Sequence, residues 1–240
     1  MATRRRAWLF AVAYVAMGVA WMFATRRDVY IVGAVRMHPT GPMLAIGAVD
    51  TLSGIVLFSP LLLGGTLAED RASGLSRLLL PRCGSRTSWV SSKFLAAFFV
   101  ASAYFVTFGL LLAAAARLLS GWNMRTLSQT VGVHTRLATH PIALVVISCV
   151  ALALAATATA SLSTVAAFFV RSTAVSLLVP VLAVFAAAFV LPPELNPYVR
   201  ASFLGVFFGW NTLGGVFAYW GVVLGLSWVG CVALARWRED

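Results

Sequence analysis

Long apolar runs separated by short polar segments make up most of this 240-residue chain. A transmembrane helix needs about 20 consecutive apolar residues, and runs of that order recur from one end of the chain to the other. A membrane β-barrel would show segments of roughly ten residues in which apolar and polar positions alternate, and the sequence lacks this pattern. The pattern therefore predicts an all-α polytopic membrane protein that forms one domain over residues 1–240. Predicted spans cover residues 8–24, 43–67, 90–116 and 212–234, and two further spans share residues 141–191.

The longest apolar run, residues 141–191, contains a single charged residue, Arg171. As one helix it would be about 75 Å long, roughly twice the thickness of a bilayer. The run must therefore turn near residues 171–173, which brings the total to six transmembrane helices. Pro180 is expected to kink the fifth of them.

Basic residues mark the orientation of the predicted spans. Residues 4–6 are all arginine and precede the first span, which we interpret as retained, because it is longer than the core of a signal peptide and lacks a small-residue cleavage motif. With the N-terminus inside, most of the 18 lysines and arginines fall on the cytoplasmic side. Six spans then predict that both termini are cytoplasmic.

The segment 192–211, before the last span, combines helix-breaking prolines with a strongly apolar second half. A short re-entrant or interfacial helix fits this pattern, because irregular backbone at membrane depth must be sheltered by protein. A sixth span that simply begins early fits it equally well, and both readings stay open.

Composition supports a membrane protein and argues against a nucleic-acid partner. Charged residues make up 10% of the chain, against about a quarter in soluble domains, and the mean hydropathy is +0.92. The net charge of +11 comes from basic residues at the ends of apolar runs, which is where topology signals lie. We therefore expect membrane lipid, and no nucleic acid, around this chain.

Enzyme motifs are missing from the sequence. There is no HExxH, no GxSxG and no acidic cluster suited to a metal ion, and His134 and His140 are best read as residues of a solvated loop. A P-loop requires a lysine after its last glycine, yet the only lysine, Lys93, follows Ser91 and Ser92. We predict no catalytic residue, no metal site, no bound cofactor and no ATP site in this chain.

Asp50 is the one acidic residue inside a predicted span. Intramembrane carboxylates are costly and often lie on ion or substrate paths. Asp50 is a candidate polar site of this kind, but a water-accessible or helix-paired carboxylate without a transport role is an equal alternative.

The segment 68–93 concentrates charge between the second and third spans. Asp70-Arg71 is followed by Gly74, then by the leucine pair 79–80, by Ser85-Arg86 and by Lys93 at the start of the next span. This series resembles the cytoplasmic loop between the second and third spans of ABC-2 type permeases, the membrane subunits of a class of ABC transporters. The intervals agree without insertion or deletion. Two departures concern residues 75–77, which read Leu-Ser-Arg where the family has Thr-Leu-Glu, and Pro81, which stands two residues early.

The resemblance implies the transmembrane subunit of an ATP-driven exporter in a prokaryotic cytoplasmic membrane. Two permease chains, identical or different, would pair around the substrate path, and each would couple through this loop to a separate ATP-binding subunit that holds ATP and Mg²⁺. Lys93 would anchor the third span at the inner interface. The residues expected to contact the ATPase are Glu69, Asp70, Arg71, Gly74, Leu79, Leu80 and Arg86.

Two other classes of function stay open. An ion-coupled secondary transporter or channel that works without an ATPase would use Asp50, and a non-transporting assembly or immunity protein would only share the fold. Nothing in the apolar spans selects a substrate among drugs, peptides, lipids, glycans and ions.

Overall fold

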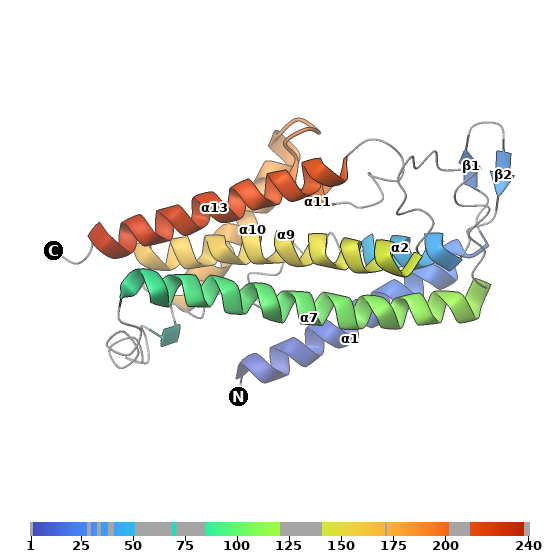
Figure 1. The fold of residues 1–240 in the computed structure, drawn as a ribbon, viewed down its shortest axis with the longest axis horizontal. Coiled ribbons are helices and arrows are strands. Elements are labelled where there is room, and N and C mark those ends of the chain that lie inside the picture. The colour runs from blue at the N-terminus through green and yellow to red at the C-terminus, as the bar shows by residue number, and fades with distance from the viewer. Residues whose placement is uncertain are drawn as a thin grey trace.

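The computed structural model shows a bundle of long helices with one small β-hairpin (Figure 1). It describes residues 2–27, 30–32, 35–37, 41–50, 69–70, 85–120, 141–170, 172–201 and 212–237. The elements are α1 (Ala2–Thr25), β1 (Tyr30–Val32), β2 (Val35–Met37), α2 (Gly41–Asp50), α7 (Arg86–Ser120), α9 (Pro141–Phe169), α10 (Thr173–Val190), α11 (Pro197–Ala201) and α13 (Leu213–Trp237).

Within the described residues, four helices are long and apolar enough to cross a membrane, judged by length and composition, so the chain is an integral membrane protein. Their apolar parts are Thr87–Ser120, Val145–Phe169, Thr173–Val190 and Leu213–Trp237. They correspond to the predicted third, fourth, fifth and sixth spans. α1 covers the predicted first span, although its apolar stretch, Val12–Thr25, is shorter. α2 covers the start of the predicted second span, and residues 51–67 lie outside the described part of the chain.

The long apolar run, residues 141–191, is divided into two helices, as its length predicts. α9 ends at Phe169 and α10 begins at Thr173, with Ser172 in extended backbone conformation between them. The predicted turn near Arg171 is therefore confirmed. Pro180 is buried within α10, which continues to Val190.

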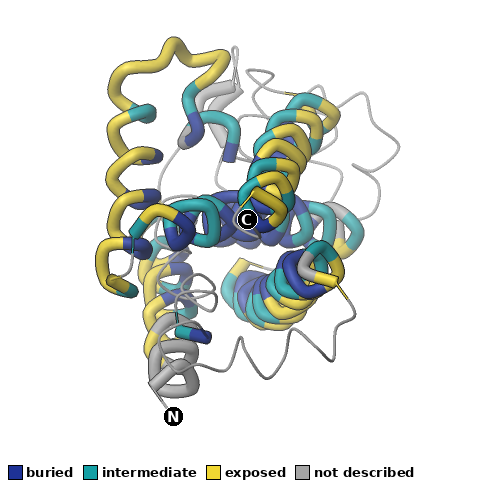
Figure 2. The backbone as a smooth tube through the Cα atoms, turned by 90° about the vertical axis from the view of Figure 1, so that its left-hand side faces the viewer, coloured by how far each residue is buried: buried dark blue, intermediate teal, exposed yellow. Residues whose placement is uncertain are grey.

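α9 lies at the centre of the bundle and packs against α2, α7, α10 and α13. Its middle is rich in buried alanines, and small residues let neighbouring helices approach closely. The hydroxyl groups of Thr157 and Thr159 donate hydrogen bonds to the carbonyls of Ala153 and Ala155 in the same helix, at 2.7 and 3.0 Å. These polar side chains are satisfied locally and serve packing. Figure 2 shows the buried positions around the middle of the bundle and the exposed ones on its outer faces.

Two close approaches fix how neighbouring helices pack. A Cβ atom on Gly109 of α7 would overlap the sulfur of Cys149 in α9, and one on Gly47 of α2 would overlap the ring of Trp21 in α1. A side chain at either glycine would therefore push two helices apart. Tyr14 of α1 adds edge-to-face ring contacts to α7, with 5.6 Å between the ring centroids of Tyr14 and Phe105.

The described residues are helical as the all-α prediction requires, apart from a short antiparallel hairpin between α1 and α2. Tyr30 pairs with Met37, and Val32 with Val35. It is the one β element in the described ranges, and it lies at the end of the bundle where α7 ends (Figure 1).

The structure describes the first part of the predicted re-entrant segment 192–211, as far as residue 201. α10 ends at Val190, and the five-residue helix α11 begins at Pro197, after Pro192 and Pro193. Two side chains of α13 hold this segment: the hydroxyl of Tyr219 donates to the carbonyl of Leu195, and the indole of Trp220 donates to the carbonyl of Arg200, both at 3.0 Å. Residues 202–211 lie outside the described residues, so the re-entrant path stays a prediction.

Candidate functional site at the base of helix α7

Helix α7 begins at Arg86, within the charged segment 68–93, and its first turn is capped. The backbone N–H of Ser88 donates to the side-chain oxygen of Ser85 at 3.1 Å, and the N–H of Trp89 donates to the Ser85 carbonyl at 3.1 Å. Serine is a favoured N-cap residue because its oxygen satisfies a backbone donor that the helix leaves free. The Ser85-Arg86 pair of the ABC-2-like motif therefore coincides with the start of α7. Arg86 is its first residue.

The first two turns of α7 are packed into a second hydrophobic cluster, separate from the centre of the bundle. Trp89, Val90 and Phe94 are buried there against Phe168 at the end of α9 and Cys231 near the end of α13. Three spans therefore meet at the base of α7. A force applied at this point would act on all three.

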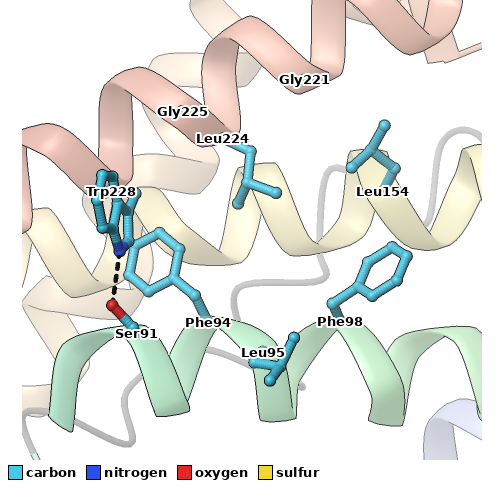
Figure 3. A pocket seen from close by; sticks show the side chains of 9 residues that line it. All are labelled: Ser91, Phe94, Leu95, Phe98, Leu154, Gly221, Leu224, Gly225 and Trp228. Atoms are coloured by element: carbon cyan, nitrogen blue, oxygen red, sulfur yellow. Dashed lines mark hydrogen bonds between the residues drawn. The ribbon is translucent and has the colours of Figure 1, made fainter. Parts of the chain in front are cut away.

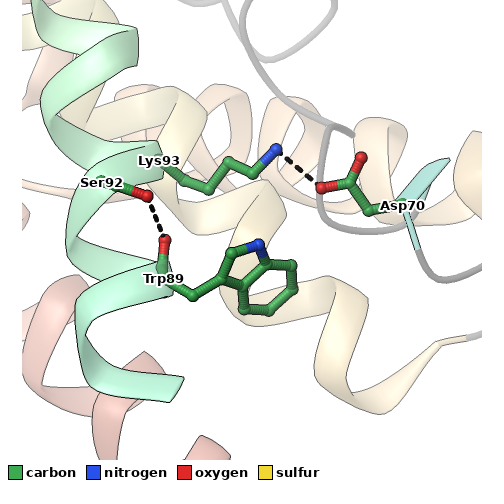
Figure 4. A network of polar contacts seen from close by, with 4 residues as sticks. All are labelled: Asp70, Trp89, Ser92 and Lys93. Atoms are coloured by element: carbon green, nitrogen blue, oxygen red, sulfur yellow. Dashed lines mark hydrogen bonds and ion pairs between the residues drawn. The ribbon is translucent and has the colours of Figure 1, made fainter. Parts of the chain in front are cut away.

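An ion pair joins the charged segment to the base of α7 (Figure 4). The ammonium of Lys93 lies 2.6 Å from a carboxylate oxygen of Asp70. The Asp70 side chain is 12% exposed and that of Lys93 is 27% exposed, so little water screens the two charges. Burial also makes each charge costly without the other. The pair therefore holds the start of the segment against the helix that follows it.

Trp89 lies beside this ion pair, and no role was predicted for it from the sequence. Its carbonyl accepts a hydrogen bond from the hydroxyl of Ser92 at 2.7 Å (Figure 4). Its indole N–H is buried and has no hydrogen-bond partner in the described part of the chain. A tryptophan near the end of a span is common, so no sequence signal marked this one.

The structure brings together two of the sequence-predicted site residues, Asp70 and Lys93. Glu69 is half-buried beside Asp70. Arg86, also predicted to contact the ATPase, is the first residue of α7, and the remaining predicted residues, Arg71, Gly74 and the leucine pair 79–80, lie outside the described residues. The predicted anchor Lys93 has a protein partner for its charge, which the positive-inside pattern does not require.

Asp50 is the last residue of α2 and is 6% exposed. α2 packs against α1, α7 and α9, so this carboxylate is enclosed by the bundle. Within the described ranges, no group of three or more histidine, cysteine or acidic side chains is placed to hold a metal ion.

Comparison with known proteins gives no relative: no family model, no curated protein and no solved structure matches the chain. Any function must therefore be inferred from the residues and their geometry. The polar contact that links a predicted loop to the transmembrane bundle is the ion pair at the base of α7.

Proposed function

We propose that this chain is the transmembrane subunit of an ATP-driven ABC-2 type exporter. It pairs with a second permease chain, identical or different, and each chain couples through residues 68–93 to a separate ATP-binding subunit that carries ATP and Mg²⁺. The observation that carries the proposal is the ion pair between Asp70 and Lys93, because it connects the segment that resembles a coupling loop to a transmembrane helix.

Coupling requires a stiff connection between the docking surface and the spans. Asp70 stands in the acidic-Arg pair of the motif, and Lys93 lies two turns into α7. Because Trp89 and Phe94 pack the base of α7 against α9 and α13, a displacement of the segment is transmitted to three helices. Interiors packed in this way transmit strain rather than absorb it.

The sequence of the segment suits a protein partner. Residues 74–80, Gly-Leu-Ser-Arg-Leu-Leu-Leu, offer four leucines for apolar contact and Arg77 for orientation. Apolar anchors supply most of the binding energy at such surfaces, and charges select the partner. A plain topology loop would account for the arginines alone, but not for the leucines or for the acidic residue tied to Lys93.

The fifth span offers a surface for a second chain. α10 packs mainly on α9 and otherwise shows an apolar outer face. Its exposed large residues are Val175, Leu178, Val179, Leu182, Phe185, Phe189 and Val190. Closure of the ATP-binding subunits would push the two loops and move the paired permeases between inward-facing and outward-facing states. Substrate contacts are expected from the second and fifth spans.

Purification of the tagged chain from its native membrane in mild detergent tests the proposal. We expect a nucleotide-binding ATPase to co-purify in stoichiometric amount with the wild type, and to be lost from Leu79→Ser/Leu80→Ser. Leu118→Ser is the matched control, because Leu118 is an exposed leucine near the other end of α7. Absence of an ATPase from the wild-type preparation under every gentle condition would refute the coupling function.

The burial of Asp50 favours one alternative, an ion-coupled transporter that works without an ATPase. Carboxylates enclosed among spans often bind the coupling ion. Transport by the purified chain driven by an ion gradient alone, and abolished by Asp50→Asn, would favour that function over the exporter.

A further inference from the structure

A groove of about 440 Å³ separates α7 from α13 on the outer side of the bundle (Figure 3). Such a volume is within the range of pockets that bind small molecules. Its lining residues come from α7, α9 and α13. They are Ser91, Phe94, Leu95, Phe98, Leu154, Gly221, Leu224, Gly225 and Trp228.

One end of the groove is polar. The indole N–H of Trp228 donates a hydrogen bond to the hydroxyl of Ser91 at 2.9 Å, which bridges the two helices (Figure 3). Ser91 lies four residues inside the apolar span Thr87–Ser120, about 6 Å along the helix axis from its start. Tryptophan is enriched at this depth, where headgroups meet the hydrocarbon. Phe98 lies about 10 Å deeper, so the groove runs from the interface into the hydrocarbon.

Two glycines leave the space along the α13 side of the groove. A Cβ atom added to Gly221 or Gly225 would meet no atom within 4 Å. Each position therefore has room for a Cβ atom, and a larger side chain there would extend over the groove that the glycine lines. Gly230, also in α13, has the same open surroundings but does not line the groove.

We propose that this groove binds one acyl chain of a membrane phospholipid, with the ester and headgroup at the Ser91–Trp228 end. Its lining residue Leu95 is apolar and exposed, so the groove opens toward hydrocarbon. Its polarity, polar at the interface and apolar below, matches that of a lipid. Exposed Arg236 lies about 12 Å beyond Trp228 along α13, on the headgroup side, and favours an anionic lipid.

The dimensions of the groove favour an acyl chain over a second transmembrane helix. A helix with its side chains is about 10–12 Å wide and crosses its partner over several turns. The α7 side of this groove rises about 10 Å from Ser91 to Phe98, and the Trp228–Ser91 hydrogen bond bridges the two helices at one end. A single flexible chain fits such a site. Lipid binding at this groove requires no ATPase partner.

Photolabelling tests this site with a defined probe, phosphatidylglycerol that carries a diazirine on one acyl chain, in phosphatidylcholine vesicles. We expect the photolabel on residues 94–98 and 221–225 to be several-fold stronger than on exposed apolar residues outside the groove, such as Leu111. Gly225→Leu fills the groove and should bring this label down to that background, whereas Gly230→Leu should keep it. Gly221→Leu gives a second filling variant should Gly225→Leu fail to accumulate.

Three results would overturn the proposal: label spread evenly over the outer faces of the spans, unchanged label in both filling variants, or equal loss in Gly230→Leu. A change of oligomeric state in the filling variants with no groove label in the wild type would instead assign the surface to a second chain.

Discussion

Lys93→Asp is expected to abolish recovery of the ATPase and to lower the free energy of unfolding by about 3 kcal/mol. Removal of one partner of a buried ion pair costs roughly 3–5 kcal/mol, and the partly exposed side chain of Lys93 places this pair at the lower end. The substitution also places a second carboxylate near that of Asp70. The start of the coupling segment would then be repelled from α7 and would no longer transmit force to it.

The exchanged pair, Asp70→Lys with Lys93→Asp, separates the contact from the individual charges. If the ion pair is the connection, the exchange restores most of the stability lost in either single variant and restores ATPase recovery. Lys93→Arg is the conservative control and should behave close to the wild type. Stability is followed by thermal unfolding in detergent and coupling by the amount of co-purified ATPase. Full ATPase recovery by Lys93→Asp alone would contradict a coupling role for the pair.

Gly109→Ala is expected to destabilise the bundle by about 2 kcal/mol, because its methyl group would overlap the sulfur of Cys149 where α7 packs on α9. Overpacking of a tight interior typically costs about 1–3 kcal/mol. The double variant Gly109→Ala/Cys149→Ala removes the overlapping atom, since the Cβ of Cys149 lies at an ordinary 3.8 Å from the added carbon.

Thermal unfolding of the two single variants and the double variant measures this coupling. Gly230→Ala in α13 is the control, since its Cβ meets no atom within 4 Å, and its effect should stay within about 0.5 kcal/mol. If Gly109→Ala proves as neutral as Gly230→Ala, the packing of α7 on α9 shown in the structure is wrong.

Helix lengths and turns could be predicted from the sequence because the bilayer limits them. The turn between α9 and α10 was predicted from the length of the apolar run that contains Arg171. In the structure α9 ends at Phe169 and α10 begins at Thr173. The predicted boundaries of the last span, residues 212 and 234, lie within three residues of those of α13, because charged residues follow the apolar run. The small hairpin was missed, because strands of three residues are too short to produce an alternating pattern.

Contacts between helices could not be predicted in the same way. Gly109 and Gly214 look alike in the sequence, yet only the first of these meets a neighbouring helix. Lys93 was predicted to anchor its span at the membrane interface, and no sequence pattern predicted its pairing with Asp70. The bond between Ser91 and Trp228 joins residues 137 positions apart. Each of these contacts depends on which faces of the helices meet, and apolar periodicity is weak when helices are apolar all round.

The most direct test of the permease function is site-specific photo-crosslinking in the native membrane. A photoreactive amino acid replaces Leu80 in the predicted docking segment, and a control chain carries it at Leu118, the exposed leucine near the other end of α7. Crosslinking from position 80, but not from position 118, to a nucleotide-binding ATPase identified by mass spectrometry is the predicted result. Efficient crosslinking from position 80 to lipid or to the chain itself, with no ATPase captured, would contradict the proposed function.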